Sequence, residues 1–227
     1  MDKKEDGGSS FIRDLILGGQ DGLVNVLGIV LAVAKATQSR YVILVSGLAA
    51  CFAESISMAA VAYTSGKAGK EYYEKQKNEL SELVRSNPTK AKVALREVYA
   101  KCGLQGTLLN RAIQEVLKSP ERARNVLAGD GSAREFEHPV RDALVVGFAA
   151  IVGSLIPLVP FMFVPIGPAV WATLGIATLT LFGSGAIKGS FTAADPFKSG
   201  LEMAIVGMAA AISGYLIGAA LGALPLA

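Results

Sequence analysis

Two acidic side chains lie inside apolar stretches of this 227-residue sequence, where a charge is costly. Asp21 belongs to the first stretch and Glu54 to the second, and Met58 follows Glu54 by about one helical turn. A charged group at the centre of a bilayer costs about 2.5–3.5 kcal/mol on insertion scales, so these acids indicate a functional site. Carboxylates bind divalent cations, and a thioether adds a soft ligand that favours the later transition metals. The three side chains therefore predict a site for a divalent transition metal within a membrane.

Metal binding at such a site is linked to protons, because a carboxylate must lose its proton before it coordinates a metal. This linkage is a physical basis for the exchange of metal against protons. One chain offers a single set of these ligands, Asp21, Glu54 and Met58. Two copies around a dimer axis could supply six ligands, or fewer with water.

Small and polar residues accompany the acids at helical spacing. The first stripe contains Asp14, Gly18, Asp21, Asn25, Gly28 and Ala32, and the second contains Gly47, Ala50, Glu54, Ser57, Met58 and Ser65. Intervals of three and four residues place each set on one helical face. We expect Gly18, Asn25, Gly28, Ala50 and Ser57 to line a pathway beside the acids. The alternative is a helix-packing seam, since small residues let helices approach closely; packing does not require two acids and a thioether.

Five apolar runs are long enough to position these residues in a bilayer. They cover about residues 15–34, 41–63, 140–164, 169–187 and 201–224, each near the roughly 20 residues that a membrane-spanning helix needs. The last run carries Gly214, Gly218 and Gly222 at four-residue intervals, which predicts a close-packing ridge. The expected fold is an all-α polytopic membrane protein with five transmembrane helices, divided into residues 1–66, 67–138 and 139–227.

Residues 67–138 form a charged insert between the second and third runs, and its signals are helical. Asn87–Pro88 looks like an N-cap followed by proline at the first helical position, and Gly103 looks like a stop signal. We expect Thr107 to cap the next helix and Ser119–Pro120 to begin a last short one, closed by Gly129. Basic and acidic residues alternate throughout, which favours a solvated surface near anionic lipid over a nucleic-acid site.

Several function classes are excluded by residue content. His138 is the only histidine, so a histidine-based metal site or catalytic triad is not expected. Cys51 and Cys102 lie in an apolar run and in the charged insert, and we expect no disulfide between them. No phosphate-binding loop or nucleophile arrangement is present, so the sequence predicts neither an enzyme nor a tightly bound cofactor.

The distribution of basic residues predicts an orientation. Lys3, Lys4, Arg13, Lys188 and Lys198 would share one side of the membrane with the insert, whereas Lys35 and Arg40 would lie on the other. By the positive-inside rule, the N-terminus and the insert are expected to be cytoplasmic. The membrane would be the plasma membrane in a prokaryote and a vacuolar-type membrane in a eukaryote.

With this layout, the sequence resembles the vacuolar iron transporter family over nearly its whole length. Asp21-Gly22-Leu23-Val24, leading to Gly28, is similar to that family's first-helix motif, and Ser57-Met58-Ala59-Ala60, followed by Tyr63 and Ser65, is similar to its second-helix motif. Residues 153–160 and 212–218 fit its later helices.

The resemblance implies a five-helix homodimer that moves ferrous iron, and often manganese, out of the cytosol in exchange for protons. The family's translocation site uses an aspartate of the first helix and a methionine of the second, which correspond to Asp21 and Met58 in this sequence. The family often has a glutamate where this chain has Ala50, and Glu54 lies one turn later instead. We therefore expect Glu54 to take the place of that acid.

The family's cytosolic metal site is thinned in this chain. Glu79 and Glu82 match its first acidic pair, Val126–Leu127 stands where the family has a methionine pair, and Asp130 lies near its trailing acid. The resemblance thus implies a weak cytoplasmic metal site. An alternative function is a non-transporting membrane metal sensor or scaffold whose insert binds a partner.

Overall fold

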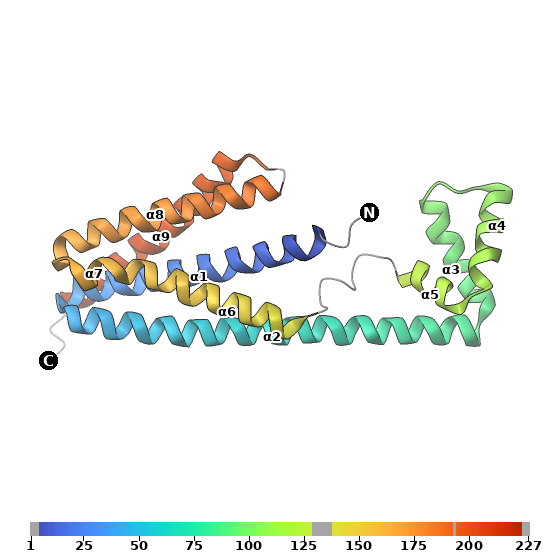
Figure 1. Cartoon of the computed structure of the whole chain (residues 1–227), viewed down its shortest axis with the longest axis horizontal. Coiled ribbons are helices and arrows are strands. Elements are labelled where there is room, and N and C mark those ends of the chain that lie inside the picture. Colours follow the sequence, from blue (N-terminus) through green and yellow to red (C-terminus); the bar gives the residue numbers. More distant parts are fainter. Residues whose placement is uncertain (1–4, 129–137, 193, 224–227) are drawn as a thin grey trace. The chain divides into compact units, whose positions relative to one another are not determined.

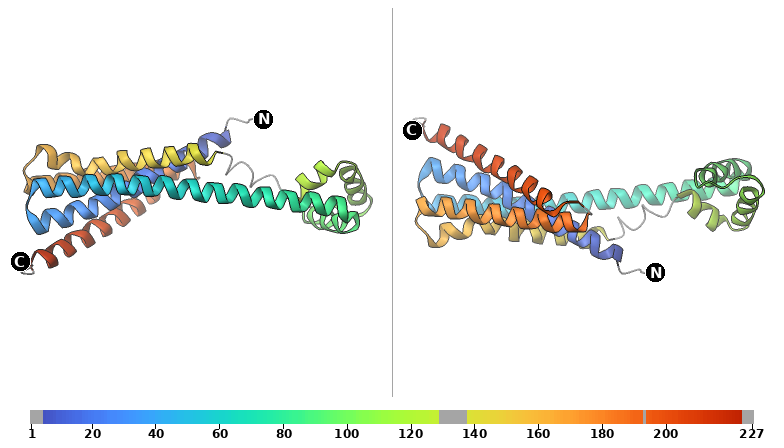
Figure 2. Two further views of the ribbon diagram at one scale, coloured as in Figure 1. Left: turned by 90° about the horizontal axis from the view of Figure 1, so that it is seen from below. Right: turned by 90° about the horizontal axis from the view of Figure 1, so that it is seen from above.

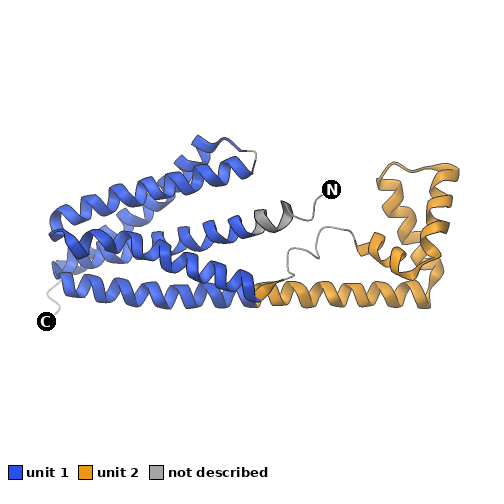
Figure 3. Cartoon of the chain, viewed as in Figure 1, with its two compact units in different colours: residues 1–63, 140–227 blue, residues 64–139 orange. Residues whose placement is uncertain are grey.

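The computed structural model describes residues 5–128, 138–192 and 194–223, and every described element is helical (Figure 1). The elements are α1 (Glu5–Thr37), α2 (Arg40–Ser86), α3 (Pro88–Lys101), α4 (Gly106–Leu117), α5 (Pro120–Ala128), α6 (Pro139–Leu155), the 3-10 turn η1 (Ile156–Leu158), α7 (Val159–Phe163), α8 (Ile166–Phe191) and α9 (Pro196–Gly222). The chain divides into unit 1, residues 1–63 and 140–227, and unit 2, residues 64–139 (Figure 3). Helix α2 contributes to both units.

Within the described chain, five helical stretches are long and apolar enough to cross a membrane. They are Phe11–Thr37, Arg40–Ser86, Pro139–Phe163, Ile166–Phe191 and Pro196–Gly222. The N-terminal end of α1 and the C-terminal end of α9 lie at opposite ends of unit 1 (Figure 1). This is the architecture of a polytopic all-α membrane protein, and it confirms the predicted fold class.

Helix α1 is the central element of unit 1, because two of its flanks are buried. One flank, with Val26 and Val30, packs in a cluster with Ile43 and Cys51 of α2 and Phe161 of α7. The other flank contributes Leu23, Leu27 and Leu31, which pack against Ala177 and Leu181 of α8 and Ala211 of α9. Since lipid tails are as apolar as leucine, close packing rather than escape from water holds such helices together.

Glycines bring α1 and α9 into backbone contact where the two helices cross (Figure 2). A Cβ at Gly214 would overlap the backbone of Gly28, and one at Gly218 would overlap the backbone of Ala32. A Cβ at Gly222 would lie only 3.0 Å from the Cα of Ala36. The predicted close-packing ridge on the last span is therefore confirmed, and its partner is α1.

The third span is broken, whereas the sequence predicted one continuous run. Helix α6 ends at Leu155, η1 follows, and α7 completes the span. Pro157 and Pro160 cause the break, because proline lacks the N–H of a helical hydrogen bond and clashes with the preceding turn. The Pro157 carbonyl instead accepts a hydrogen bond of 3.1 Å from Oγ1 of Thr173 on α8.

Unit 2 has a small apolar core of its own. It comprises Val84, Ala91, Leu95, Leu109, Ile113 and Ala123. Asn87 caps α3 as predicted, since its Oδ1 accepts from the Lys90 amide at 3.1 Å. Gly103 ends the helix region with φ +84°. Pro120 begins α5 as expected, and Gly129 lies outside the described residues.

The predicted cap of the middle insert helix is wrong by two residues. The N-cap of α4 is Gln105, and Gly106 is the first helical residue with φ +63°. Such a φ is readily accessible only to glycine, so Gly106 rather than Thr107 sets where this helix begins.

Candidate functional site

The polar stripes of α1 and α2 are connected by a hydrogen bond between Asn25 and Glu54. Nδ2 of Asn25 on α1 donates a hydrogen bond to Oε1 of Glu54 on α2. Asp21 lies about one turn before Asn25 on α1, and its carboxylate also interacts with that of Glu54. Two acids that are distant in the sequence thus lie together in the membrane-spanning unit.

Met58 lies on α2 about 6 Å along the helix axis from Glu54 and is half-buried. Ser57 beside it is exposed. Within the described residues, no group of three or more histidine, cysteine, aspartate or glutamate side chains is placed to hold a metal ion. A single chain therefore presents an open arrangement of two carboxylates with a thioether nearby, not a closed metal cage.

The Asn25–Glu54 pair lies at the edge of the helix bundle. Asn25 is exposed, and Glu54 is half-buried. The neighbouring face of α2 is apolar and uncovered, with Phe52 at 57% and Ile56 at 70% exposure. The site in one chain therefore opens onto a surface that another helix could cover.

Five other hydroxyl groups of the spanning helices form hydrogen bonds within their own helix. Each donates to the carbonyl four residues earlier in its own helix: Ser46, Ser55, Thr180, Ser190 and Ser213. Such bonds are common for serine and threonine in helices and require no ligand. Asn25 differs, because its amide reaches across to a carboxylate of another helix.

Three residues expected to line the pathway lie at packing seams. A Cβ at Gly18 would overlap the Val146 carbonyl of α6, and Gly28 lies against Gly214 of α9. Ala50 packs against the apolar cluster of α1 and α2. The helix-packing alternative accounts for these three positions. Asn25 lies beside Glu54, and Ser57 is an exposed residue of α2.

Asp14 is a buried acid that the sequence assigned only to the polar stripe. It is 5% exposed, and its Oδ1 lies 3.4 Å from Nε of Arg13. Its Oδ2 has no hydrogen-bond partner within the described residues. The spacing of seven residues between Asp14 and Asp21 was the available signal, because it places both acids on one face of α1.

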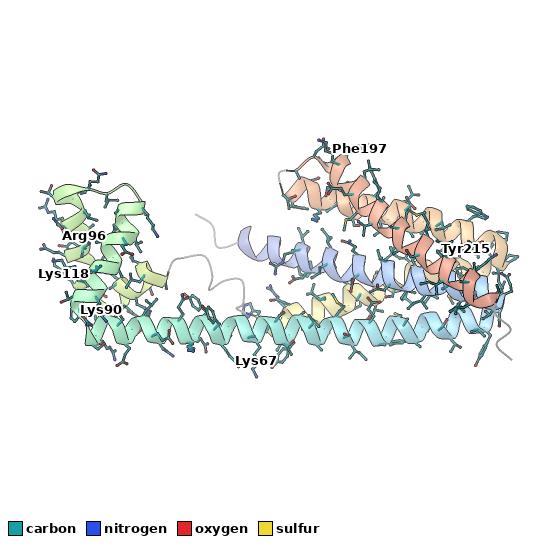
Figure 4. The ribbon with its side chains drawn as sticks, turned by 180° about the vertical axis from the view of Figure 1, so that it is seen from behind. Lys67, Lys90, Arg96, Lys118, Phe197 and Tyr215 are labelled. Atoms are coloured by element: carbon teal, nitrogen blue, oxygen red, sulfur yellow. The ribbon has the colours of Figure 1, made fainter. Side chains whose placement is uncertain are left out.

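The insert acids lie in a different environment. Glu79 is 67% exposed and pairs with Lys75 on the same helix at 3.9 Å, and Glu82 is also exposed. Val126 and Leu127 pack against the apolar core of unit 2. Unit 2 also carries basic side chains, among them Lys90, Arg96 and Lys118 (Figure 4). Asp130 lies outside the described residues.

Comparison with known proteins finds relatives that match most of the chain. The profile of the VIT family matches residues 12–219. Vacuolar iron transporter 1 of Eucalyptus grandis is 29% identical, over 90% of this chain and 84% of its own length. Vacuolar iron transporter cccA of Arthroderma benhamiae is 27% identical over 88% and 76%, and the vacuolar iron transporter of Toxoplasma gondii is 26% identical over 94% and 75%. The chain belongs to the VIT family.

Proposed function

We propose that this protein carries divalent transition metal, ferrous iron and also manganese, out of the cytosol in exchange for protons. The observation that carries the proposal is the meeting of Asp21, Asn25 and Glu54 between two membrane-spanning helices. The names of the relatives, vacuolar iron transporters in plants, a fungus and Toxoplasma, support iron as cargo.

Metal would bind between the carboxylates of Asp21 and Glu54, with the Met58 sulfur as a soft ligand. Carboxylate oxygens alone suit magnesium and calcium as well as manganese, whereas the thioether favours later transition metals. Protons and metal compete for the same carboxylate oxygens, so arrival of one displaces the other. Asn25 orients the Glu54 carboxylate by donating to one of its oxygens.

A homodimer would complete the coordination. One chain leaves the site open beside an uncovered apolar face that includes Phe52 and Ile56. A second copy related by a two-fold axis would bring the same face and a second set of ligands to the site, as in most symmetric dimers. The pathway would then run along the dimer axis rather than through one bundle.

Proteoliposomes test the transport proposal. The purified protein is reconstituted with a metal-sensitive dye and a pH-sensitive dye inside, and a proton gradient is imposed. We expect uptake of iron and manganese together with proton movement in the opposite direction, and loss of uptake when a protonophore removes the gradient. Metal binding in detergent without uptake above that of empty liposomes would favour the sensor or scaffold function instead.

We further propose that the N-terminus and the insert are cytoplasmic and that the C-terminus lies on the opposite side. The basis is the lysine and arginine distribution together with the odd number of spans. Cysteine labelling in a Cys102→Ser background checks this, with Ser86→Cys and Ala227→Cys each probed by an impermeant reagent. The two positions should react from opposite sides, and reaction of both from one side would contradict the topology.

A further inference from the structure

A cavity of about 530 Å³ lies among α1, α8 and α9 in unit 1. Its apolar wall includes Leu31, Val170, Leu174, Met208 and Ile212. The volume falls within the range of about 300–1,000 Å³ that is typical of small-molecule sites. None of its lining residues belongs to the proposed metal site.

The cavity opens sideways from the bundle. Trp171 and Ile212 line it and are 76% and 55% exposed. Along α1, the lining extends from Leu31 to Lys35, about 6 Å at the helical rise, and Gln38 follows just beyond the end of the helix. This length is about a fifth of the roughly 30 Å hydrocarbon core, and it lies at the C-terminal end of the first span. The cavity therefore faces the outer part of the lipid acyl chains.

One end of the cavity carries a positive charge. Nζ of Lys35, in the last turn of α1, lies 5.3 Å above the ring centre of Tyr215 on α9. No carboxylate forms an ion pair with Lys35 within the described residues. The Gln38 amide at the same end already donates to the Ala34 carbonyl at 2.9 Å. The ammonium group thus remains available for an anion.

We propose that this cavity binds one anionic phospholipid, with its phosphate at Lys35 and the first part of an acyl chain against Leu31, Leu174 and Met208. An apolar cavity that opens toward lipid is filled by lipid rather than water, since water needs several polar partners to enter. Tyr215 holds the ammonium by a cation–π contact, and Trp171 is an aromatic residue of the type enriched at the membrane interface. The proposal is independent of the transport function.

The single tryptophan of the chain provides a direct probe, because Trp171 lines the cavity. The full-length protein is reconstituted in phosphatidylcholine vesicles that contain a small fraction of brominated lipid, either phosphatidylglycerol or phosphatidylcholine. Bromine near the upper part of the acyl chain quenches a nearby indole. We expect the quenching to show that phosphatidylglycerol associates about fivefold more tightly than phosphatidylcholine. This factor corresponds to the attraction of about 1 kcal/mol between one lysine and an anionic headgroup.

Three variants identify the source of this preference. Lys35→Gln should remove it, and Lys35→Arg should keep it, which separates loss of charge from loss of folding. Lys188→Gln is the matched control, since Lys188 lies in the last turn of α8, about 25 Å along that helix from Trp171, and does not line the cavity. The proposal is overturned if both lipids quench equally in the parent or if Lys35→Gln keeps the preference. It is likewise overturned if Lys188→Gln loses the preference, or if neither lipid quenches because a second chain fills the cavity.

Discussion

Glu54 in the membrane-spanning unit and Glu79 in the insert differ in the partners of their carboxylates. Glu54 accepts a hydrogen bond from Asn25 on a different helix, whereas Glu79 is exposed and pairs with Lys75 on its own helix. Exposed pairs of the second kind contribute only about 0–1 kcal/mol, and they form wherever charges are spaced by one turn. The first kind requires two helices to bring polar groups together in an apolar unit. This difference supports the proposal that metal binds in the spans rather than in the insert.

The largest expected effect is that of Asp21→Asn. It removes a proposed metal ligand, so uptake of both iron and manganese in proteoliposomes should fall by about 100-fold or more, beyond the 10–100-fold typical of outer-shell changes. Glu202→Gln, an exposed acid near the start of α9, is the matched control and should transport at the parent rate. Both variants should elute in the same oligomeric state as the parent. Parent-level uptake by Asp21→Asn would make this acid structural.

Glu54→Gln should abolish exchange driven by a pH gradient, because glutamine neither releases a proton nor coordinates strongly. Equilibrium metal binding, measured by calorimetry in detergent, then separates two roles. Binding should fall if Glu54 is a ligand and stay unchanged if it carries only the proton. Asn25→Ala should reduce metal affinity by about tenfold, as for other groups that orient a ligand. Full exchange in Glu54→Gln would remove this residue from the mechanism.

Met58→Leu should have a smaller and metal-dependent effect. Leucine keeps the volume and loses the sulfur, so the site becomes purely oxygen-based and iron should lose more uptake than manganese. Competition between the two metals in one liposome preparation measures the ratio directly. An equal loss for both metals would indicate that Met58 acts only through packing.

The smallest effect is expected in the insert. Joint replacement of Glu79 and Glu82 by glutamine should leave uptake within about twofold of the parent, because isolated surface charges contribute little. Calorimetry on the full-length Asp21→Asn protein should reveal no submicromolar metal binding, since the insert is basic and its Val126 and Leu127 offer no ligand. Submicromolar binding that disappears when Glu79 and Glu82 are replaced would restore a metal site to the insert.

Hydropathy predicted the spans, and helical periodicity placed Asp21 and Glu54 each on a polar stripe of its helix. Periodicity could not predict which residues pack against each stripe. Asp21 meets the carboxylate of Glu54, while Gly18 and Gly28 on the same stripe of α1 meet α6 and α9. Helical spacing determines which residues share a face, and only packing determines what covers that face. For the same reason, the sequence did not predict that Val126 packs against the apolar core of unit 2, because that core includes residues distant in the sequence, such as Val84 and Leu95.

The break in the third span was visible as Pro157 and Pro160, yet a hydropathy pattern does not distinguish a proline from any other residue of similar polarity. Asn87 was predictable for the opposite reason, since a cap depends only on the residues of the first helical turn, here Asn87 to Lys90. Features that depend on neighbouring residues, such as helix caps, can therefore be predicted from the sequence. The hydrogen bond that satisfies the Pro157 carbonyl cannot, because its donor, Thr173, lies on another helix.

The hydrogen bond from Thr173 to the Pro157 carbonyl has a consequence for biogenesis. A carbonyl without a partner in the hydrocarbon region costs several kcal/mol, and the donor here is synthesised after its acceptor. Until the fourth span has been synthesised, the third span therefore has a backbone carbonyl without a hydrogen-bond donor. We expect it to be released into the bilayer only together with the fourth, as a helical hairpin, and a chain that stops at Phe163 to remain at the insertion site longer than one that stops at Phe191.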